Sequence, residues 1–257
     1  MDLDLSGKVA IVTGASRGIG RAIAETLAAE GMQLTLAARS RDQLEALSAA
    51  IPTKSLVQAV DLREPEAPDR IVAATIAHFG TLDLLVNNAG ATKRGDFLEL
   101  SDADWDDGYR LKFFGAMRCS RAAWPHLRAS RGGIVNIVGI GGRTGTAEFT
   151  IGGTVNAALL NLTKCLADRG IADGVRVNAI NPGSIATERL QARLRSFAAE
   201  EGVDESQAGR EMAKSFRIGR FGEPGEIARV VAFLASPQAG YCQGAIVDVD
   251  GGATRTL

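Results

Sequence analysis

The sequence has few of the side chains that build disulfides, metal centres and catalytic triads. Its 257 residues include three cysteines, two histidines and two tyrosines. The cysteines, Cys119, Cys165 and Cys242, are odd in number and widely spaced, which favours free thiols in a reducing compartment over disulfides or a zinc site. The two histidines, His78 and His126, lie far from every motif described below. No Ser–His–Asp set or metal cluster is therefore expected.

An excess of one charge is also missing. There are 29 lysines and arginines against 30 aspartates and glutamates, a net charge of −1. Binding to nucleic acid or to a membrane surface needs a strong positive field, so neither partner is expected. No apolar run approaches the roughly 18 residues of a membrane span. The N-terminus, MDLDLSGK, has two aspartates and no hydrophobic signal region, so we expect a cytoplasmic globular protein.

The chain does contain a regular alternation of short β-branched runs and longer helical patterns. The runs expected to form strands are residues 9–12, 34–37, 56–60, 82–86, 134–138, 175–180 and 246–249. Most are continuously apolar, which is typical of strands covered by helices on both faces. Helical compositions fill the intervening segments, including residues 21–29, 41–50, 69–78 and 226–235. The pattern predicts an α/β fold, a single doubly wound parallel sheet of the Rossmann-like type over residues 1–257.

One segment interrupts this alternation. A long polar and helical insert, residues 184–216, precedes the last helical pattern. In doubly wound sheets such inserts lie over the carboxyl ends of the strands, where ligands bind. We therefore expect a substrate lid, with a plain surface excursion as the alternative.

A glycine-rich turn directly follows the first strand, with the sequence Thr13-Gly14-Ala15-Ser16-Arg17-Gly18-Ile19-Gly20. Gly14 permits a tight turn, Gly18 lets the backbone approach a pyrophosphate, and Gly20 allows close packing of helix and strand. The helix that follows would present free N–H groups and its positive dipole end to the phosphates. The turn predicts a dinucleotide site.

The end of the second strand indicates which dinucleotide is bound. An NAD site generally has an acidic residue here that binds the ribose 2′-hydroxyl, whereas this chain has Arg39 followed by Ser40. Because guanidinium groups match phosphate geometry, Arg39 and Arg17 are expected to hold a 2′-phosphate. The prediction is NADP(H) rather than NAD(H); the alternative is that Arg39 is only a solvated residue at a helix start.

Over essentially its whole length the sequence resembles the short-chain dehydrogenase/reductase family. The matching motifs are the 13–20 turn, Asp61-Leu62, Asn87-Asn88-Ala89-Gly90, Asn136-Ile137, Asn181-Pro182-Gly183-Ser184-Ile185-Ala186-Thr187 and Asp250-Gly251-Gly252. The resemblance implies that Asp61 and Leu62 flank the adenine and that Asn88, Ala89 and Gly90 line the cofactor. It also implies that the segment with Pro182, Gly183, Ile185 and Thr187 meets the nicotinamide carboxamide.

The chain departs from the family pattern at the four positions that normally carry the chemistry. In the family a tyrosine transfers the proton that accompanies hydride transfer, and a lysine four residues later lowers its pKa. A serine binds the substrate oxygen, and an asparagine supports a water link to the lysine. Alignment on Trp105, Asn136-Ile137 and residues 156–159 puts four replacements at these positions. They are Lys112 for the asparagine, Gly139 for the serine, Gly152 for the tyrosine and Asn156 for the lysine.

The asparagine and the lysine are thus exchanged rather than lost. We expect Lys112 and Asn156 to enter one pocket from adjacent helices. Lys112 would then be a proton donor, an oxyanion stabiliser or, with a pKa lowered by burial, a nucleophile. The alternative is a lysine that fills space or pairs with Asp107 or Glu148.

Two further features of this region bear on the site. Gly139 and Gly152, together with Gly141, Gly142 and Gly153, predict a wall with little side-chain volume, which suits either an enlarged site or a dead one. Tyr109 could share a helix face with Lys112, although a packing role is favoured. Tyr241 falls in a turn before the last strand, away from the expected site.

The resemblance implies an NADP(H)-dependent oxidoreductase that acts on a small carbonyl or alcohol compound by a non-standard mechanism. It also implies a homodimer or homotetramer that associates through helices at about 104–127 and 154–168. Two other functions remain open: a non-redox lyase, hydrolase or isomerase that uses Lys112, or a catalytically silent nucleotide-binding protein. Lys93, Arg94 and Arg143 lie near the predicted cleft, where solvated surface charge is favoured over a role in binding an anion.

Overall fold

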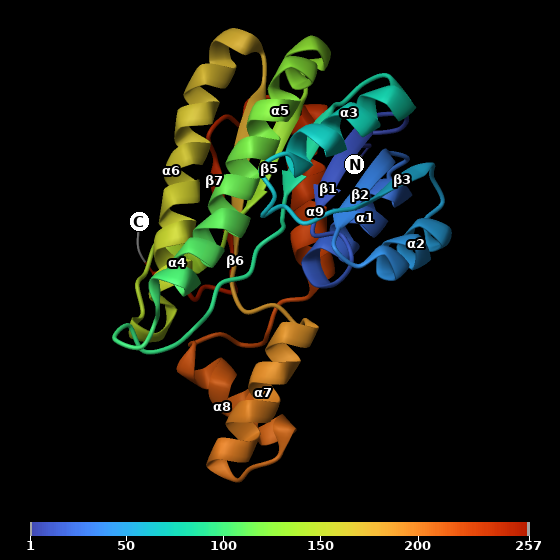
Figure 1. The fold of residues 1–257 in the computed structure, drawn as a ribbon. Coiled ribbons are helices and arrows are strands. Elements are labelled where there is room, and N and C mark those ends of the chain that lie inside the picture. The colour runs from blue at the N-terminus through green and yellow to red at the C-terminus, as the bar shows by residue number, and fades with distance from the viewer. Residues whose placement is uncertain (1, 256–257) are drawn as a thin grey trace.

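A parallel β-sheet forms the middle layer of the protein (Figure 1), and the computed structural model describes residues 2–255. Its strand order is β3-β2-β1-β4-β5-β6-β7. The strands are β1 (Val9–Thr13), β2 (Gln33–Ala38), β3 (Ser55–Ala59), β4 (Leu84–Asn87), β5 (Gly133–Ile137), β6 (Arg176–Pro182) and β7 (Ile246–Val249). Every strand expected from the sequence is present, and the predicted doubly wound Rossmann-like sheet is confirmed.

Helices cover both faces of the sheet because successive side chains of each strand point to opposite faces. The helices are α1 (Gly18–Ala29), α2 (Arg41–Ala50), α3 (Ala67–Phe79), α4 (Asp102–Gly108), α5 (Gly115–Ser130), α6 (Thr150–Asp173), α7 (Glu188–Glu201), α8 (Glu205–Ser215) and α9 (Pro224–Ala235). On one face Val12 packs in a core with α1, α2 and α9. On the other face Ile11 packs in a core with α3, α5 and α6.

The order of the strands positions the ligand site. β1 pairs with β2 on one side and with β4 on the other. The strands after β1 are therefore added first on one side of it, as β2 and β3, and then on the other side, from β4 onward. Ligands of open α/β sheets bind at such a switch point, beyond the carboxyl ends of the strands. Thr13 at the end of β1 fixes this edge, because its hydroxyl donates to Val86 O and accepts from the amides of Asn88 and Ala89.

Two elements differ from a plain succession of helices. The helix expected over residues 104–127 is interrupted by a π-helical turn, Tyr109–Phe114, between α4 and α5. The insert at 184–216 forms α7 and α8, which project from the carboxyl end of the sheet (Figure 1). A bridge between Ile185 and Gly222 ties the two ends of this projection together. No helix in the described part of the chain meets the length and hydropathy needed to cross a membrane.

Candidate active site

The glycine turn after β1 has the geometry of a phosphate cradle. Gly14 and Gly18 have positive φ angles of 66° and 56°, which side chains rarely adopt. A Cβ at Gly20 would overlap the carbonyl oxygen of Gly14. α1 starts at Gly18, and the side chain of its N-cap, Arg17, makes no cap hydrogen bond. The first amides of α1 therefore keep their capacity to bind an anion, and this cradle fits a dinucleotide phosphate.

The segment 88–90 packs directly against this turn. Asn88 Nδ2 donates to the carbonyl oxygens of Thr13 and Gly14, at 3.0 and 3.2 Å. A Cβ at Gly14 would lie 2.9 Å from the Cα of Ala89. The predicted cofactor residues of β1 and β4 thus form one surface.

The two arginines predicted to bind the 2′-phosphate, Arg17 and Arg39, pair with different carboxylates. Arg39 Nη1 lies 4.0 Å from Asp61 Oδ2, whereas Arg17 Nη1 lies 3.4 Å from Glu188 Oε2 on α7. Both guanidinium groups are exposed, so exchanging these carboxylates for a phosphate costs little. Leu62 is buried in the core beside this end of the site, and Ser40 is the N-cap residue of α2.

The segment between β6 and α7 returns over the phosphate turn. Gly183 N donates to Val249 O at 3.1 Å, and Thr187 is the N-cap residue of α7. A Cβ at Gly18 would lie 3.3 Å from Thr187 Cγ2. The predicted nicotinamide-side residues and the base of the α7–α8 projection therefore lie beside the predicted phosphate residues.

Lys112 and Asn156 meet, as expected from their exchange. Lys112 Nζ donates to Asn156 Oδ1 and to Val138 O, both at 2.6 Å. Asn156 Nδ2 faces Gly139 O at 3.4 Å. The methylene chain of Lys112 packs on Gly90, where a Cβ would lie 2.9 Å from Lys112 Cδ. The amine therefore lies between residues 88–90, the predicted cofactor segment, and the end of β5.

The surroundings of Lys112 favour its neutral form. Burial of the amine lowers its pKa from 10.5 to about 7, with a further contribution from the positive charge of Arg189. Both of its hydrogen-bond acceptors are uncharged oxygens, so no carboxylate opposes this effect. A pKa near 7 suits a group that must both give and regain a proton at neutral pH.

The alternative partners of Lys112 are occupied elsewhere. Asp107 accepts from Arg63 Nη2 at 2.8 Å, and Glu148 lies near Arg94. The hypothesis that Lys112 pairs with Asp107 or Glu148 is therefore wrong. The expectation that Tyr109 and Lys112 share a helix face is also wrong. The two residues lie in a π-helical turn, whose hydrogen bonds join residues five apart, so residues three apart no longer lie on one face. The Tyr109 ring instead packs edge-on against Phe113.

The glycine wall is not an empty space, which corrects the idea of an enlarged site. The ring of Phe149 fills it: a Cβ at Gly152 would overlap this ring, and one at Gly141 would lie 2.9 Å from Phe149 Cε1. Phe149 was missed by the sequence analysis. Its only signal was its place three residues before Gly152: Phe149 is the N-cap residue of α6, and Gly152 lies in the first turn of that helix.

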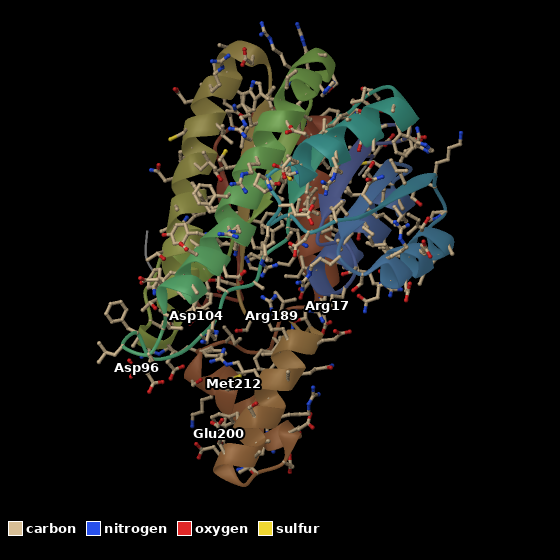
Figure 2. The ribbon with its side chains drawn as sticks, in the orientation of Figure 1. Arg17, Asp96, Asp104, Arg189, Glu200 and Met212 are labelled. Carbon is tan, nitrogen blue, oxygen red and sulfur yellow. The ribbon has the colours of Figure 1, made fainter. Side chains whose placement is uncertain are left out.

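The basic residues around the cleft differ in their environment. Lys93 pairs with Asp104 at 2.9 Å and Arg143 with Asp248 at 3.4 Å. Arg94 instead has its guanidinium carbon 4.1 Å from the centre of the Phe149 ring. Arg189, also missed from the sequence, donates to Gly90 O at 3.1 Å. Figure 2 shows Arg17 and Arg189 where α7 joins the rest of the protein.

The remaining reactive groups lie outside this arrangement. Cys119, Cys165 and Cys242 are free, and burial raises the pKa of the Cys119 thiol to about 12. Tyr241 is exposed in the turn before β7, at the amino ends of the strands. His78 packs edge-on against Phe79 at the end of α3.

Comparisons with known proteins find relatives over nearly the whole chain. The family described as Enoyl-(Acyl carrier protein) reductase matches residues 14–254. NovJ of Streptomyces niveus, a short-chain reductase protein, is 39% identical over 248 residues, which cover 95% of this chain and 93% of NovJ. The 3-oxoacyl-(acyl-carrier-protein) reductase FabG of Escherichia coli is 34% identical over 97% of this chain and 98% of FabG.

The chain belongs to the short-chain dehydrogenase/reductase family.

Among solved structures of this family's fold, L-sorbose reductase from Gluconobacter frateurii, complexed with NADPH and L-sorbose, matches with a TM-score of 0.95. It is 36% identical, and the match covers 100% of both chains. This short-chain dehydrogenase/reductase is accordingly an oxidoreductase that uses a nicotinamide cofactor on a small-molecule substrate.

Proposed function

We propose that the protein is an NADP(H)-dependent oxidoreductase that interconverts a carbonyl compound and its alcohol, with Lys112 in place of the usual tyrosine. The observation that carries this proposal is the position of the Lys112 amine. It is hydrogen-bonded to Asn156 and Val138 O and packs on Gly90 of the cofactor segment.

The cofactor would be held by the residues predicted for it. Its phosphates would bind at Ser16, Arg17, Gly18, Ile19 and Gly20, and its 2′-phosphate at Arg39 and Ser40. Asp61 and Leu62 would flank the adenine, and the 88–90 and 182–187 segments would contain the nicotinamide end. The bound cofactor supplies or accepts the hydride.

Lys112 would handle the proton and the charge on the substrate oxygen. When a carbonyl is reduced, its carbon gains a hydride and its oxygen gains a proton. The ammonium form of Lys112 can give that proton and regain one from water in the cleft, since its pKa is about 7. Two of its three N–H bonds are engaged by Asn156 and Val138. The third is left to face the substrate oxygen, and Asn156 acts as a positioning residue.

The size of this contribution can be bounded. A well-placed general acid contributes about 10²–10⁴-fold to rate. Removal of Lys112 should therefore slow the reduction by about this factor, and the residual rate would come from binding of the cofactor and orientation of the substrate.

The test follows NADPH absorbance with a panel of ketones, aldehydes and oxo acids. We expect turnover that falls about 10²-fold or more in Lys112→Met, with NADPH affinity kept and a rate that declines as pH rises through about 7 in the reductive direction. Lys164→Met, which removes an exposed lysine from α6, is the matched control.

Other outcomes favour the alternatives. Tight NADPH binding with no turnover of any panel compound favours a silent nucleotide-binding protein. A covalent adduct at Lys112, trapped by borohydride under turnover of a carbonyl compound without NADPH consumption, favours a non-redox enzyme.

A further inference from the structure

We propose that Phe149 is a positioning residue for the Asn156–Lys112 pair, because its ring takes the space of the usual tyrosine side chain and closes the wall beside Asn156. The inference rests on the proposed function, since it identifies what holds the Lys112 amine in place. Phe149 would act through Asn156 and would itself neither give nor take a proton.

The Phe149 ring and a side chain at position 152 exclude each other. Gly152 aligns with the tyrosine of the family pattern, and a Cβ at this position would overlap the ring atoms Cζ and Cε2 of Phe149. The wall is therefore not open where the phenol is missing. Phe149 is the N-cap residue of α6, so its ring enters this space from the start of the helix that carries Asn156.

The ring adjoins Asn156 by two routes. Gly152 lies four residues before Asn156, so the two positions are neighbours on one face of α6. Gly141 lies next to both groups: a Cβ there would lie 2.9 Å from Phe149 Cε1 and 3.6 Å from Asn156 Nδ2. Because protein interiors are closely packed, a shift of the ring is transmitted to the amide through one intervening residue.

Asn156 needs this support because its own hydrogen bonds hold it firmly only at one end. The residue is 2% exposed. Its Oδ1 accepts from Lys112 Nζ at 2.6 Å, whereas its Nδ2 lies 3.4 Å from Gly139 O, which is longer than a usual N–H···O bond. Turned over, the amide would present its NH₂ group to the Lys112 donor, and that hydrogen bond would be lost. Packing of the wall therefore keeps Oδ1 directed at Lys112.

The loop after β4 also holds the ring. The guanidinium carbon of Arg94 lies 4.1 Å from the centre of the Phe149 ring, an arrangement in which the ring face attracts the cation. Gly95 N donates to Glu148 O at 3.2 Å and fixes the backbone next to Phe149. The ring is thus clamped between this loop and α6, and the contact gives Arg94 a role that needs no ligand.

Loss of the ring should change the surroundings of Lys112. An alanine at position 149 leaves a void beside Gly141 and Gly152, where backbone polar groups give water its partners. Water in this void reaches the Asn156 amide and solvates the ammonium. The pKa of Lys112, which burial of the amine lowers to about 7, then moves back toward 10.5.

The charge that acts on Lys112 stays in place in this comparison. Within residues 2–255 the charged group that contributes to its pKa is Arg189. Its other neighbours, Gly90, Val138 O and the Asn156 amide, are uncharged. Because no variant below alters Arg189, a change in the titration of Lys112 reports a change in its burial.

The test measures the ionisation of Lys112 itself and needs no substrate. The full chain is labelled with ¹³C-lysine, and the Cε signal of Lys112 is identified by its absence from Lys112→Met. We expect a titration midpoint near pH 7 in the parent and one about a unit or more higher in Phe149→Ala. Phe149→Leu, which refills much of the space, should lie between the two. Phe97→Ala, which removes an exposed ring from the loop after β4, is the matched control and should leave the midpoint unchanged.

Refilling the space separates support of Asn156 from a general loss of structure. Benzene has the size of the lost ring, and it should return the midpoint of Phe149→Ala to within about half a unit of the parent value and leave the parent unchanged. Gly152→Ala displaces the ring without removing it. It should shift the midpoint in the same direction with unchanged far-ultraviolet circular dichroism, and it decides the question if Phe149→Ala does not fold.

The proposal is overturned if folded Phe149→Ala or Gly152→Ala keeps the midpoint of the parent, if Phe97→Ala shifts it as much, or if the parent already titrates near 10.5. A shift that benzene does not reverse would assign the effect to altered folding and would overturn it too. A reversible shift without turnover of any panel compound would leave this role of Phe149 standing and refute the redox role of Lys112. Turnover that depends on Lys112, with a midpoint that Phe149→Ala does not change, would do the reverse.

Discussion

The depressed pKa of Lys112 can be tested by the pH dependence of folding stability. Replacing Lys112 by Met keeps the length of the side chain and removes the titrating amine. Because the pKa is about 7 in the folded protein and 10.5 ordinarily, the unfolded chain binds more protons between these values. The cost of burying the ammonium is fully present below pH 7 and is relieved as the pH rises from 7 to 10.5, so the stability of the parent protein increases over that window.

The magnitude follows from the two pKa values. At 1.36 kcal/mol per pKa unit the full difference corresponds to at most about 5 kcal/mol. Between pH 6.5 and 9.5 the parent protein should gain about 3 kcal/mol relative to Lys112→Met. The variant also leaves Val138 O and Asn156 Oδ1 without their donor. This costs about 1–3 kcal/mol at every pH and does not alter the slope.

The assay is urea denaturation at several pH values, with the free energy of unfolding compared between variants. All other titratable groups are common to both proteins and cancel in the difference. Lys164→Met, at an exposed position of α6, should show a constant difference from the parent. A difference for Lys112→Met that changes by less than about 0.5 kcal/mol across the range would mean that its ammonium stays solvated, and the assignment of Lys112 as a proton donor near neutral pH would fail.

Two further predictions concern the glycine wall and the cofactor. Gly152→Ala should destabilise the protein by about 1–3 kcal/mol, because the added Cβ meets the Phe149 ring. In a Phe149→Ala background the same change should be neutral or stabilising, and Gly145→Ala, where nothing lies within 4 Å, is the control; equal effects in both backgrounds would refute the contact. Arg39→Ala should weaken NADPH binding about tenfold or more in a fluorescence titration and leave NADH binding unchanged. Arg41→Ala serves as the neighbouring control, and equal losses for both cofactors would show that Arg39 does not bind the 2′-phosphate.

Much of the molecule could be predicted from local patterns. The strands were expected because continuous apolar runs need cover on both faces, and the glycine turn because glycine readily adopts the positive φ angles found at Gly14 and Gly18. The meeting of Lys112 and Asn156 was expected from the exchange of two residue types between two aligned positions.

Other features depended on packing between segments that are distant in the sequence. The glycines at positions 152 and 141 indicate from the sequence only that side-chain volume is small there. They do not indicate that the Phe149 ring fills the space beside them. The partner of Asp107 is Arg63, 44 residues away, so nothing near Asp107 in the sequence indicates that it is unavailable to Lys112. The π turn at Tyr109–Phe114 is equally invisible to a pattern that assumes α-helical spacing.

The sequence by itself determined the parallel sheet and the glycine turn after β1, since these depend on residue type and on spacing along the chain. Only the tertiary structure decided that the amine of Lys112 is buried between neutral acceptors and that the Phe149 ring fills the space beside Gly152 and Gly141. The reason is physical: the pKa of a lysine and the filling of a space depend on every group within a few ångströms, whichever part of the chain supplies it.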